Sequence, residues 1–234
     1  MTLAPPLVLF DVDLTLLTAK GAGARSLLAA LADLTGVRIA VETVKFEGAT
    51  DYAIHGWLCE EAGVLDLTEE FRARLVENYL GRLVAEVAAR PPVAMPGVAG
   101  TLERLLAAGA TLGLATGNLE RGARIKLDPL GLNRFFSAGG FGDRHADRTD
   151  VVLAAIEACS ARHGVPFAPS GTVVVGDTPR DIDAGRRAGA RTVGVATGNH
   201  TRAALAGADL VLTDLAEATR LAEFILGPRA TSKG

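Results

Sequence analysis

The chain has 234 residues, 49% of them hydrophobic, and a formal net charge of −3. This length and apolar content suit one large α/β domain, or a core domain with a smaller companion, and they argue against disorder. Because no long run of basic residues occurs and aromatic residues make up only 5%, the composition also argues against a nucleic-acid partner.

The N-terminus and the cysteines indicate the compartment. The opening residues MTLAPPLVLFD lack the positive segment and long apolar run of a signal peptide, and no apolar run is long enough to span a bilayer. Cys59 and Cys159 lie far apart and fit no metal or disulfide pattern. We therefore expect a soluble, cytoplasmic protein with no membrane partner, in which both cysteines are small apolar residues.

The stretch LVLFDVDLTLL, residues 7–17, predicts a buried first strand that carries Asp11 and Asp13. Side chains two residues apart on a strand point to the same face. Burying two like charges on one face is costly unless a positive group meets them. The stretch therefore predicts a cation beside these two aspartates.

The next segment has helical periodicity. Apolar residues recur at helical spacing in three groups, which are Leu27, Leu28, Leu31 and Leu34, then Ile54, Trp57 and Leu58, then Phe71, Leu75, Tyr79, Leu83 and Val87. Pro and Gly in PPVAMPGV, residues 91–98, end the pattern. We predict a helical cap domain over residues 18–92, inserted into a core domain of residues 1–17 and 93–234. Such an insertion stands over the carboxyl end of the sheet, where open α/β folds bind ligands.

Strand-like and helical segments alternate in the rest of the chain. The predicted strands are TLGLAT (111–116), TVVVGD (172–177), RTVGVAT (191–197) and LVLT (210–213), with FFSAGGF (135–141) as a weaker candidate. The predicted helices are 97–109, 148–164 and 179–190. This alternation predicts βαβ units and an α/β fold with a parallel, Rossmann-like sheet covered on both faces.

Polar residues end two of these strands. Thr116 is followed by Gly117 and Asn118, and Asp177 is followed by Asp181 four residues later. Parallel neighbours would bring these groups to the sheet edge that carries the first two aspartates. Carboxylates and phosphate oxygens are the ligands that Mg²⁺ prefers, and a Thr-Gly-Asn turn before a helix suits an anion. For any one of these aspartates alone, a turn or a helix cap is the favoured explanation, but the conjunction favours a metal and phosphate site.

The motifs DVDLT, TGN and GDTPRDID, in this order, resemble those of the haloacid dehalogenase superfamily. The closest similarity is to its phosphatase branch, in which a helical cap follows the first strand. The resemblance extends from Val8 to about Thr197, and FEGATD at 46–51 resembles the cap. It implies a phosphoglycolate-phosphatase-like enzyme that hydrolyses a small phosphorylated metabolite with Mg²⁺ through an aspartyl-phosphate, as a monomer or homodimer.

The resemblance also implies roles for the aspartates. Asp11 is the expected nucleophile and Asp13 the general acid/base. Asp11, the backbone carbonyl of Asp13 and Asp177 are the expected direct metal ligands, and Asp181 binds directly or through water. Thr116, Gly117 and Asn118 are expected to bind phosphate.

One motif departs from the family's pattern. The family's phosphate-binding basic residue is commonly a Lys followed by Pro, and this chain has no Lys-Pro. Lys126 is the only lysine between the second and fourth motifs, and we expect it to be badly placed for the strand ends. The stretch GDRHADRTDVV instead offers Arg144 and Arg148. We predict that Arg148, directly before a helix capped by Thr149 or Asp150, binds the phosphate.

Other functions remain open to different degrees. A phosphosugar mutase shares all the core motifs, whereas a 2-haloacid dehalogenase needs neither a metal nor Asp13. A phosphonate-cleaving relative would use a cap lysine, for which Lys45 is the only candidate. A catalytically idle interaction module would be marked by loss of Asp11 or Asp13. His55, on a cap helix near Trp57, is a candidate for lining the substrate pocket, but we expect it to be a surface residue.

Overall fold

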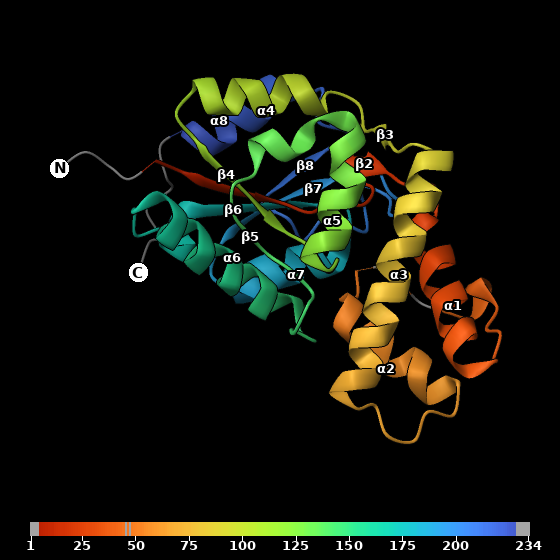
Figure 1. The fold of residues 1–234 in the computed structure, drawn as a ribbon. Helices are drawn as coiled ribbons and strands as arrows, with labels where there is room; N and C mark the ends of the chain where they lie inside the picture. The colour runs from red at the N-terminus through yellow and green to blue at the C-terminus, as the bar shows by residue number, and fades with distance from the viewer. Residues whose placement is uncertain (1–4, 45, 47, 228–234) are drawn as a thin grey trace.

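The computed structural model describes residues 5–44, 46 and 48–227. A six-stranded sheet forms its centre in the order β5-β4-β1-β6-β7-β8 (Figure 1), and every neighbouring pair is parallel. The strands are β1 Leu7–Phe10, β4 Thr111–Ala115, β5 Gly139–Gly140, β6 Thr172–Gly176, β7 Arg191–Val195 and β8 Leu210–Leu212. The predicted α/β class and parallel sheet are confirmed.

Helices cover both faces of the sheet. Figure 1 shows α4 and α8 on one face and α6 and α7 on the other. The bounds are α4 Val98–Ala107, α5 Glu120–Leu127, α6 Arg148–His163, α7 Pro179–Arg187 and α8 Ala218–Leu226. Alternate side chains of β1 join different clusters, since Val8 and Phe10 pack with residues of α4 and α8, whereas Leu7 and Leu9 pack with those of α6 and α7. Burial on both faces explains why this strand is continuously apolar.

The register brings three strands to an end at one level. Phe10 of β1 stands beside Leu114 of β4 and Val175 of β6. The prediction of a strand over residues 7–17 is wrong in length, because β1 ends at Phe10. Leu14 has a φ of 61°, so the chain turns immediately after the two aspartates. Asp11 and Asp13 therefore follow the strand rather than lying within it.

The segment after β1 is mainly helical. Its helices are α1 Ala22–Thr35, α2 Asp51–Glu61 and α3 Glu69–Ala89, and the 3-10 turn Val41–Thr43 lies between the first two. The short strands β2 Leu17–Thr18 and β3 Val93–Ala94 form an antiparallel pair where the chain leaves the sheet and returns. Figure 1 shows the three helices together at the carboxyl end of the sheet, with α1 packed against α3. The division into two domains stays a prediction.

Several smaller expectations have clear outcomes. Both cysteines are free and buried, as expected. His55 is 1% exposed, so the expectation of a surface histidine is wrong. Lys45 lies outside the described residues. Within the part of the chain that the structure describes, no helix is long and apolar enough to cross a bilayer.

Candidate active site

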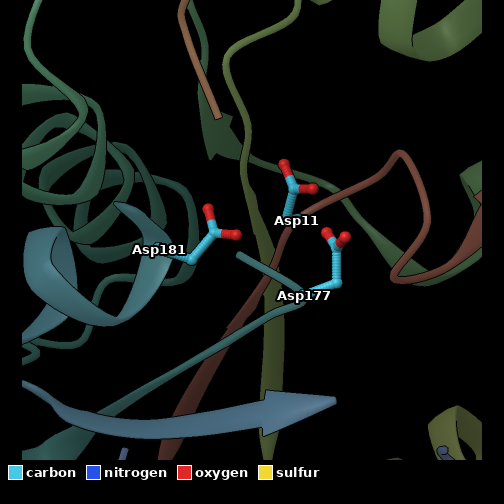
Figure 2. Close-up of side chains that lie close together, drawn as sticks. All are labelled: Asp11, Asp177 and Asp181. Carbon is cyan, nitrogen blue, oxygen red and sulfur yellow. The ribbon is translucent and has the colours of Figure 1, made fainter. Parts of the chain in front are cut away.

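Three buried carboxylates meet at the carboxyl end of the sheet. Asp11 directly follows β1, Asp177 directly follows β6, and Asp181 lies in the first turn of α7 (Figure 2). One oxygen from each lies within 4.8 Å of the other two. The parallel register alone brings Asp11 and Asp177 together, because their strands are neighbours that end at the same level.

Helix capping places the third carboxylate. The Thr178 hydroxyl caps α7 by accepting a bond from the Asp181 amide at 3.3 Å. Asp181 Oδ2 in turn accepts bonds from the Thr178 amide at 3.0 Å and its hydroxyl at 2.7 Å. This reciprocal arrangement is a capping box. The capping box occupies Oδ2 of Asp181 and leaves Oδ1 directed toward the cluster. Asp181 therefore caps α7 and also belongs to the site.

The carboxylate cluster carries more negative than positive charge, because Arg148 is the one cation that pairs with its three carboxylates within the described residues. Burial, opposed by the nearby Arg148 and reinforced by Asp181 and Asp13, raises the pKa of Asp11 to about 6. Burial and repulsion from Asp11 and Asp181 raise the pKa of Asp177 to about 8. A divalent cation among these oxygens would remove the repulsion, and hard oxygen donors are the ligands that Mg²⁺ takes. The residues therefore fit a magnesium ion.

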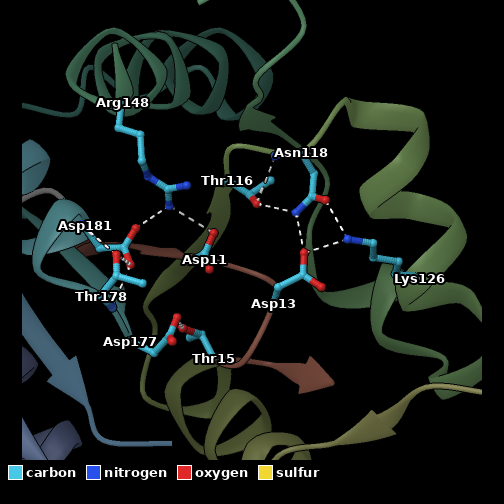
Figure 3. A network of polar contacts seen from close by, with 10 residues as sticks. All are labelled: Asp11, Asp13, Thr15, Thr116, Asn118, Lys126, Arg148, Asp177, Thr178 and Asp181. Atoms are coloured by element: carbon cyan, nitrogen blue, oxygen red, sulfur yellow. Dashed lines mark hydrogen bonds and ion pairs between the residues drawn. The ribbon is translucent and has the colours of Figure 1, made fainter. Parts of the chain in front are cut away.

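Arg148 supplies the one guanidinium at this cluster within the described residues. Its Nη2 donates to Asp11 Oδ1 at 3.0 Å and also to Asp181 Oδ1, and its side chain is 11% exposed (Figure 3). Arg148 is the first residue of α6, and Asp147 caps this helix by accepting from the Thr149 amide at 2.8 Å. The predicted caps Thr149 and Asp150 are wrong by two or three residues. The cation nevertheless reaches the nucleophile candidate.

A second cation lies on the opposite flank of the site. Lys126 Nζ donates to Asp13 Oδ2 at 2.6 Å and to Asn118 Oδ1 at 2.7 Å (Figure 3). Asn118 Nδ2 donates to Asp13 Oδ2 at 2.9 Å and to Thr116 Oγ1 at 2.8 Å. The expectation that Lys126 is badly placed is therefore wrong.

Helix geometry explains this contact. Side chains on an α-helix tilt toward its N-terminus, so a long side chain in the last turn of α5 reaches back toward the loop before it. Gly122 and Lys126 lie four residues apart on one face of α5, and Asn118, four residues before Gly122, lies in the loop just before the helix. A Cβ at Gly122 would lie 3.4 Å from the Tyr79 hydroxyl, so this glycine allows α5 to pack closely on α3. The four-residue spacing was the signal in the sequence.

The helical segment closes the site from the other side. A pocket of about 340 Å³ is lined by Asp11, Asp13 and Arg148 from the sheet edge and by Lys20, Ile54 and Tyr79 from the helical segment. All the other predicted site residues also line it, namely Thr116, Gly117, Asn118, Asp177 and Asp181. Their chemical roles stay predictions.

Asp51 joins the two parts of the molecule and was not predicted. Its amide donates to the Gly117 carbonyl at 2.6 Å, and its Oδ2 accepts from the Leu119 amide at 2.8 Å. Burial raises the pKa of Asp51 to about 6. Gly117 permits this approach, because a Cβ there would lie 2.2 Å from the Ala49 carbonyl oxygen. The start of α2 is thus docked directly on the loop after β4.

Comparison with known proteins places this site in a family. The model of the haloacid dehalogenase-like hydrolases matches residues 8–195. A phosphoglycolate phosphatase from Agrobacterium fabrum is 30% identical over 211 residues, which cover 82% of this chain and 81% of that protein. The crystal structure of CbbY from Rhodobacter sphaeroides in complex with phosphate is 21% identical, with a TM-score of 0.71 and coverage of 91% of this chain and 96% of that one.

A β-phosphoglucomutase from Clostridium difficile has the same fold. It is 17% identical, with a TM-score of 0.71 and coverage of 96% of this chain and 100% of that one. The family match covers most of the chain, including β1, β4, β6 and the helical segment between β1 and β4. The chain belongs to the haloacid dehalogenase-like hydrolase family.

Proposed function

We propose that this chain is a Mg²⁺-dependent phosphatase that hydrolyses a small phosphorylated metabolite, in the manner of a phosphoglycolate phosphatase, with Asp11 as nucleophile. One observation carries the proposal. The Asp11 carboxylate is held at the end of β1 by Arg148 and lies in one oxygen cluster with Asp177 and Asp181. The phosphoglycolate phosphatase relative supports a phosphate ester as the substrate.

Asp11 is well placed for covalent catalysis. Its attack on phosphorus would form an aspartyl-phosphate and expel the alcohol, and water would then release phosphate and restore the carboxylate. Splitting one displacement in two in this way lowers each barrier. Arg148, which already contacts Asp11 Oδ1, would hold the oxygens of the transferring group with its planar fork of N–H donors. Thr116 and the turn after β4 would bind the same group from the other side.

Asp13 suits proton transfer. Its side chain is 40% exposed, against 9% for Asp11, and it lines the pocket without belonging to the cluster of three carboxylates. In the first step Asp13 would give a proton to the leaving oxygen. In the second it would take a proton from the attacking water.

The metal would be held by the three clustered carboxylates and the backbone carbonyl of Asp13. When bound, Mg²⁺ offsets the repulsion between the carboxylate nucleophile and the anionic phosphate. Thr15 orients one of these ligands, since its hydroxyl donates to Asp177 Oδ1 at 3.3 Å.

Phosphate release tests the proposal. The purified chain is assayed on 2-phosphoglycolate, a panel of sugar phosphates and p-nitrophenyl phosphate, with Mg²⁺ or with a chelator. We expect release that requires Mg²⁺ and is absent from the Asp11→Asn variant. No release from any substrate with Mg²⁺ would contradict the proposal. Conversion of a sugar phosphate into its isomer without release would favour the mutase, and chelator-resistant dehalogenation of a 2-haloacid would favour the dehalogenase.

A further inference from the structure

Lys126 is a buried cation that the proposed metal cluster does not use. Its side chain is 5% exposed, and lysine is rarely buried to this extent without a partner. Its partners are Asp13 Oδ2 and Asn118 Oδ1 rather than the three clustered carboxylates. The contact is therefore directed at the residue to which the proposed function assigns proton transfer.

The two oxygens of Asp13 have different surroundings. Oδ2 accepts from Lys126 Nζ at 2.6 Å and from Asn118 Nδ2 at 2.9 Å. No described residue donates a hydrogen bond to Oδ1, although Asp13 lines the pocket. With Oδ2 held by two donors, Oδ1 is the oxygen left to meet a substrate or a water molecule.

The donors of this network are themselves fixed. Asn118 is held at both ends of its amide, because Oδ1 accepts from Lys126 and Nδ2 donates to Thr116 Oγ1 as well as to Asp13. Gly23 of α1 covers the lysine, since a Cβ at this position would lie 3.4 Å from Lys126 Nζ and 3.7 Å from the Tyr79 hydroxyl. Removing the ammonium would leave the Asn118 oxygen with no donor among the described residues, and the Asp13 carboxylate would keep only its bond from Asn118 Nδ2.

We propose that Lys126 is a positioning residue for Asp13, an inference that rests on the proposed function. By holding Oδ2, it presents Oδ1 to the leaving-group oxygen and later to water. In the first step the Asp11 oxygen bonds to phosphorus, the ester P–O bond breaks, and the proton on Asp13 passes to the departing alcohol. In the second step water bonds to phosphorus as it loses a proton to Asp13, and the bond from Asp11 to phosphorus breaks.

This role predicts a kinetic signature that a structural role does not. A nitrophenolate leaves readily without a proton, whereas an alkoxide does not, so the first step should suffer only with alkyl phosphates. The second step needs Asp13 with every substrate. Loss of Lys126 should therefore let the aspartyl-phosphate accumulate during turnover of p-nitrophenyl phosphate.

The test compares Lys126→Met with Arg121→Met. Arg121 lies on the same helix and forms an exposed ion pair with Glu77 of α3, so its removal also weakens a contact between α5 and the helical segment. We expect Lys126→Met to lower kcat on an alkyl phosphate about 100-fold with little change in KM. On p-nitrophenyl phosphate we expect a burst of nitrophenol and accumulated phosphoenzyme. Arg121→Met should show neither.

Other outcomes would overturn the inference. These are wild-type kcat in Lys126→Met, or equal losses on both substrates without accumulated phosphoenzyme. If Lys126→Met does not fold by circular dichroism, Lys126→Gln, which keeps a donor without the charge, carries the same two readouts. A wild-type chain that releases no phosphate would defeat the proposed function itself. Wild-type release combined with a Lys126 variant that behaves like Arg121→Met would defeat this inference alone.

Discussion

Arg148 and Lys126 both line the pocket, but they have different neighbours and, in our account, different tasks. Arg148 contacts Asp11 and Asp181, two of the three clustered carboxylates, and so lies where charge on phosphate would collect. Lys126 contacts none of that cluster and instead holds Asp13 and Asn118. In the proposed mechanism, phosphate and metal binding are therefore separated from proton transfer at one sheet edge, because α6 supplies Arg148 and α5 supplies Lys126.

Substitution of the proposed nucleophile, Asp11, should have the largest effect of all the changes at the site. We predict that Asp11→Asn abolishes turnover while leaving the fold intact, since the amide neither attacks phosphorus well nor carries the charge that the metal would need. Phosphate release and circular dichroism measure the two parts of this prediction. Turnover within about tenfold of wild type, in protein shown by mass spectrometry to be free of deamidation, would exclude Asp11 as nucleophile.

Exchange of the bound metal tests the proposed metal site on the Arg148 flank. We predict that chelation removes activity, that Mg²⁺ restores it and that Ca²⁺ inhibits, because the larger ion takes more oxygen ligands in a looser geometry and would draw Asp11 out of line. The measurement is phosphate release in metal-free buffer with each ion added back. Full activity after exhaustive chelation would contradict the metal assignment.

Substitution of Arg148 should cause a smaller loss of activity. We predict that Arg148→Ala loses about 100-fold in kcat/KM, or about 3 kcal/mol of transition-state stabilisation. Arg144→Ala is the matched control and should lose much less, because Arg144 is exposed and the pocket does not include it. If the two losses were reversed, Arg144 would be the phosphate ligand.

The residues of the Arg148 flank could be predicted from the sequence, whereas Lys126 on the other flank was not. The aspartates and Arg148 were found because each follows or precedes a predicted element at a sheet edge, and parallel register brings such positions together. Lys126 was missed because its position was judged by distance from the strand end, whereas a long side chain in the last turn of α5 reaches back to the loop that holds Asn118. Asp51 was missed for a different reason. Its contacts with the loop after β4 depend on how the helical segment docks, which local patterns do not specify.

His55 was misjudged for the same reason as Asp51. Its T-shaped contact with Tyr79 joins α2 to α3, and its Nε2 is buried with no hydrogen-bond partner among the residues that the structure describes. The apolar spacing of each helix was visible in the sequence, but the packing of one helix on the other was not. A surface position could therefore not be told from a buried one.

His55 also offers a contrast to both cations, because it is a buried titratable group outside the pocket. Burial, with a further contribution from Arg72, lowers the pKa of His55 from 6.5 to about 4. Between these values the unfolded chain binds more protons, so this residue's contribution to stability falls as the pH falls from about 6.5 toward 4. We predict that His55→Leu removes about 2 kcal/mol of the difference in unfolding free energy between pH 7 and pH 5.

Urea unfolding of wild type and variant at both pH values measures this effect. The comparison must be made as a difference, because the raised pKa values of Asp11 and Asp177 act in the opposite direction and are common to both proteins. Turnover at neutral pH should stay close to wild type. An unchanged pH dependence of stability in His55→Leu would show that His55 does not titrate as described.

The passage of the phosphoryl group through Asp11 is the central claim, and trapping the intermediate tests it most directly. Wild-type protein is quenched in acid during turnover, the acyl phosphate is reduced with borohydride, and the peptide spanning residues 7–17 is sequenced by mass spectrometry. We predict homoserine in place of Asp11, and an unmodified peptide when substrate is omitted. Reduction at Asp13 or Asp177 instead, or a burst of product with no modified residue at position 11, would contradict it.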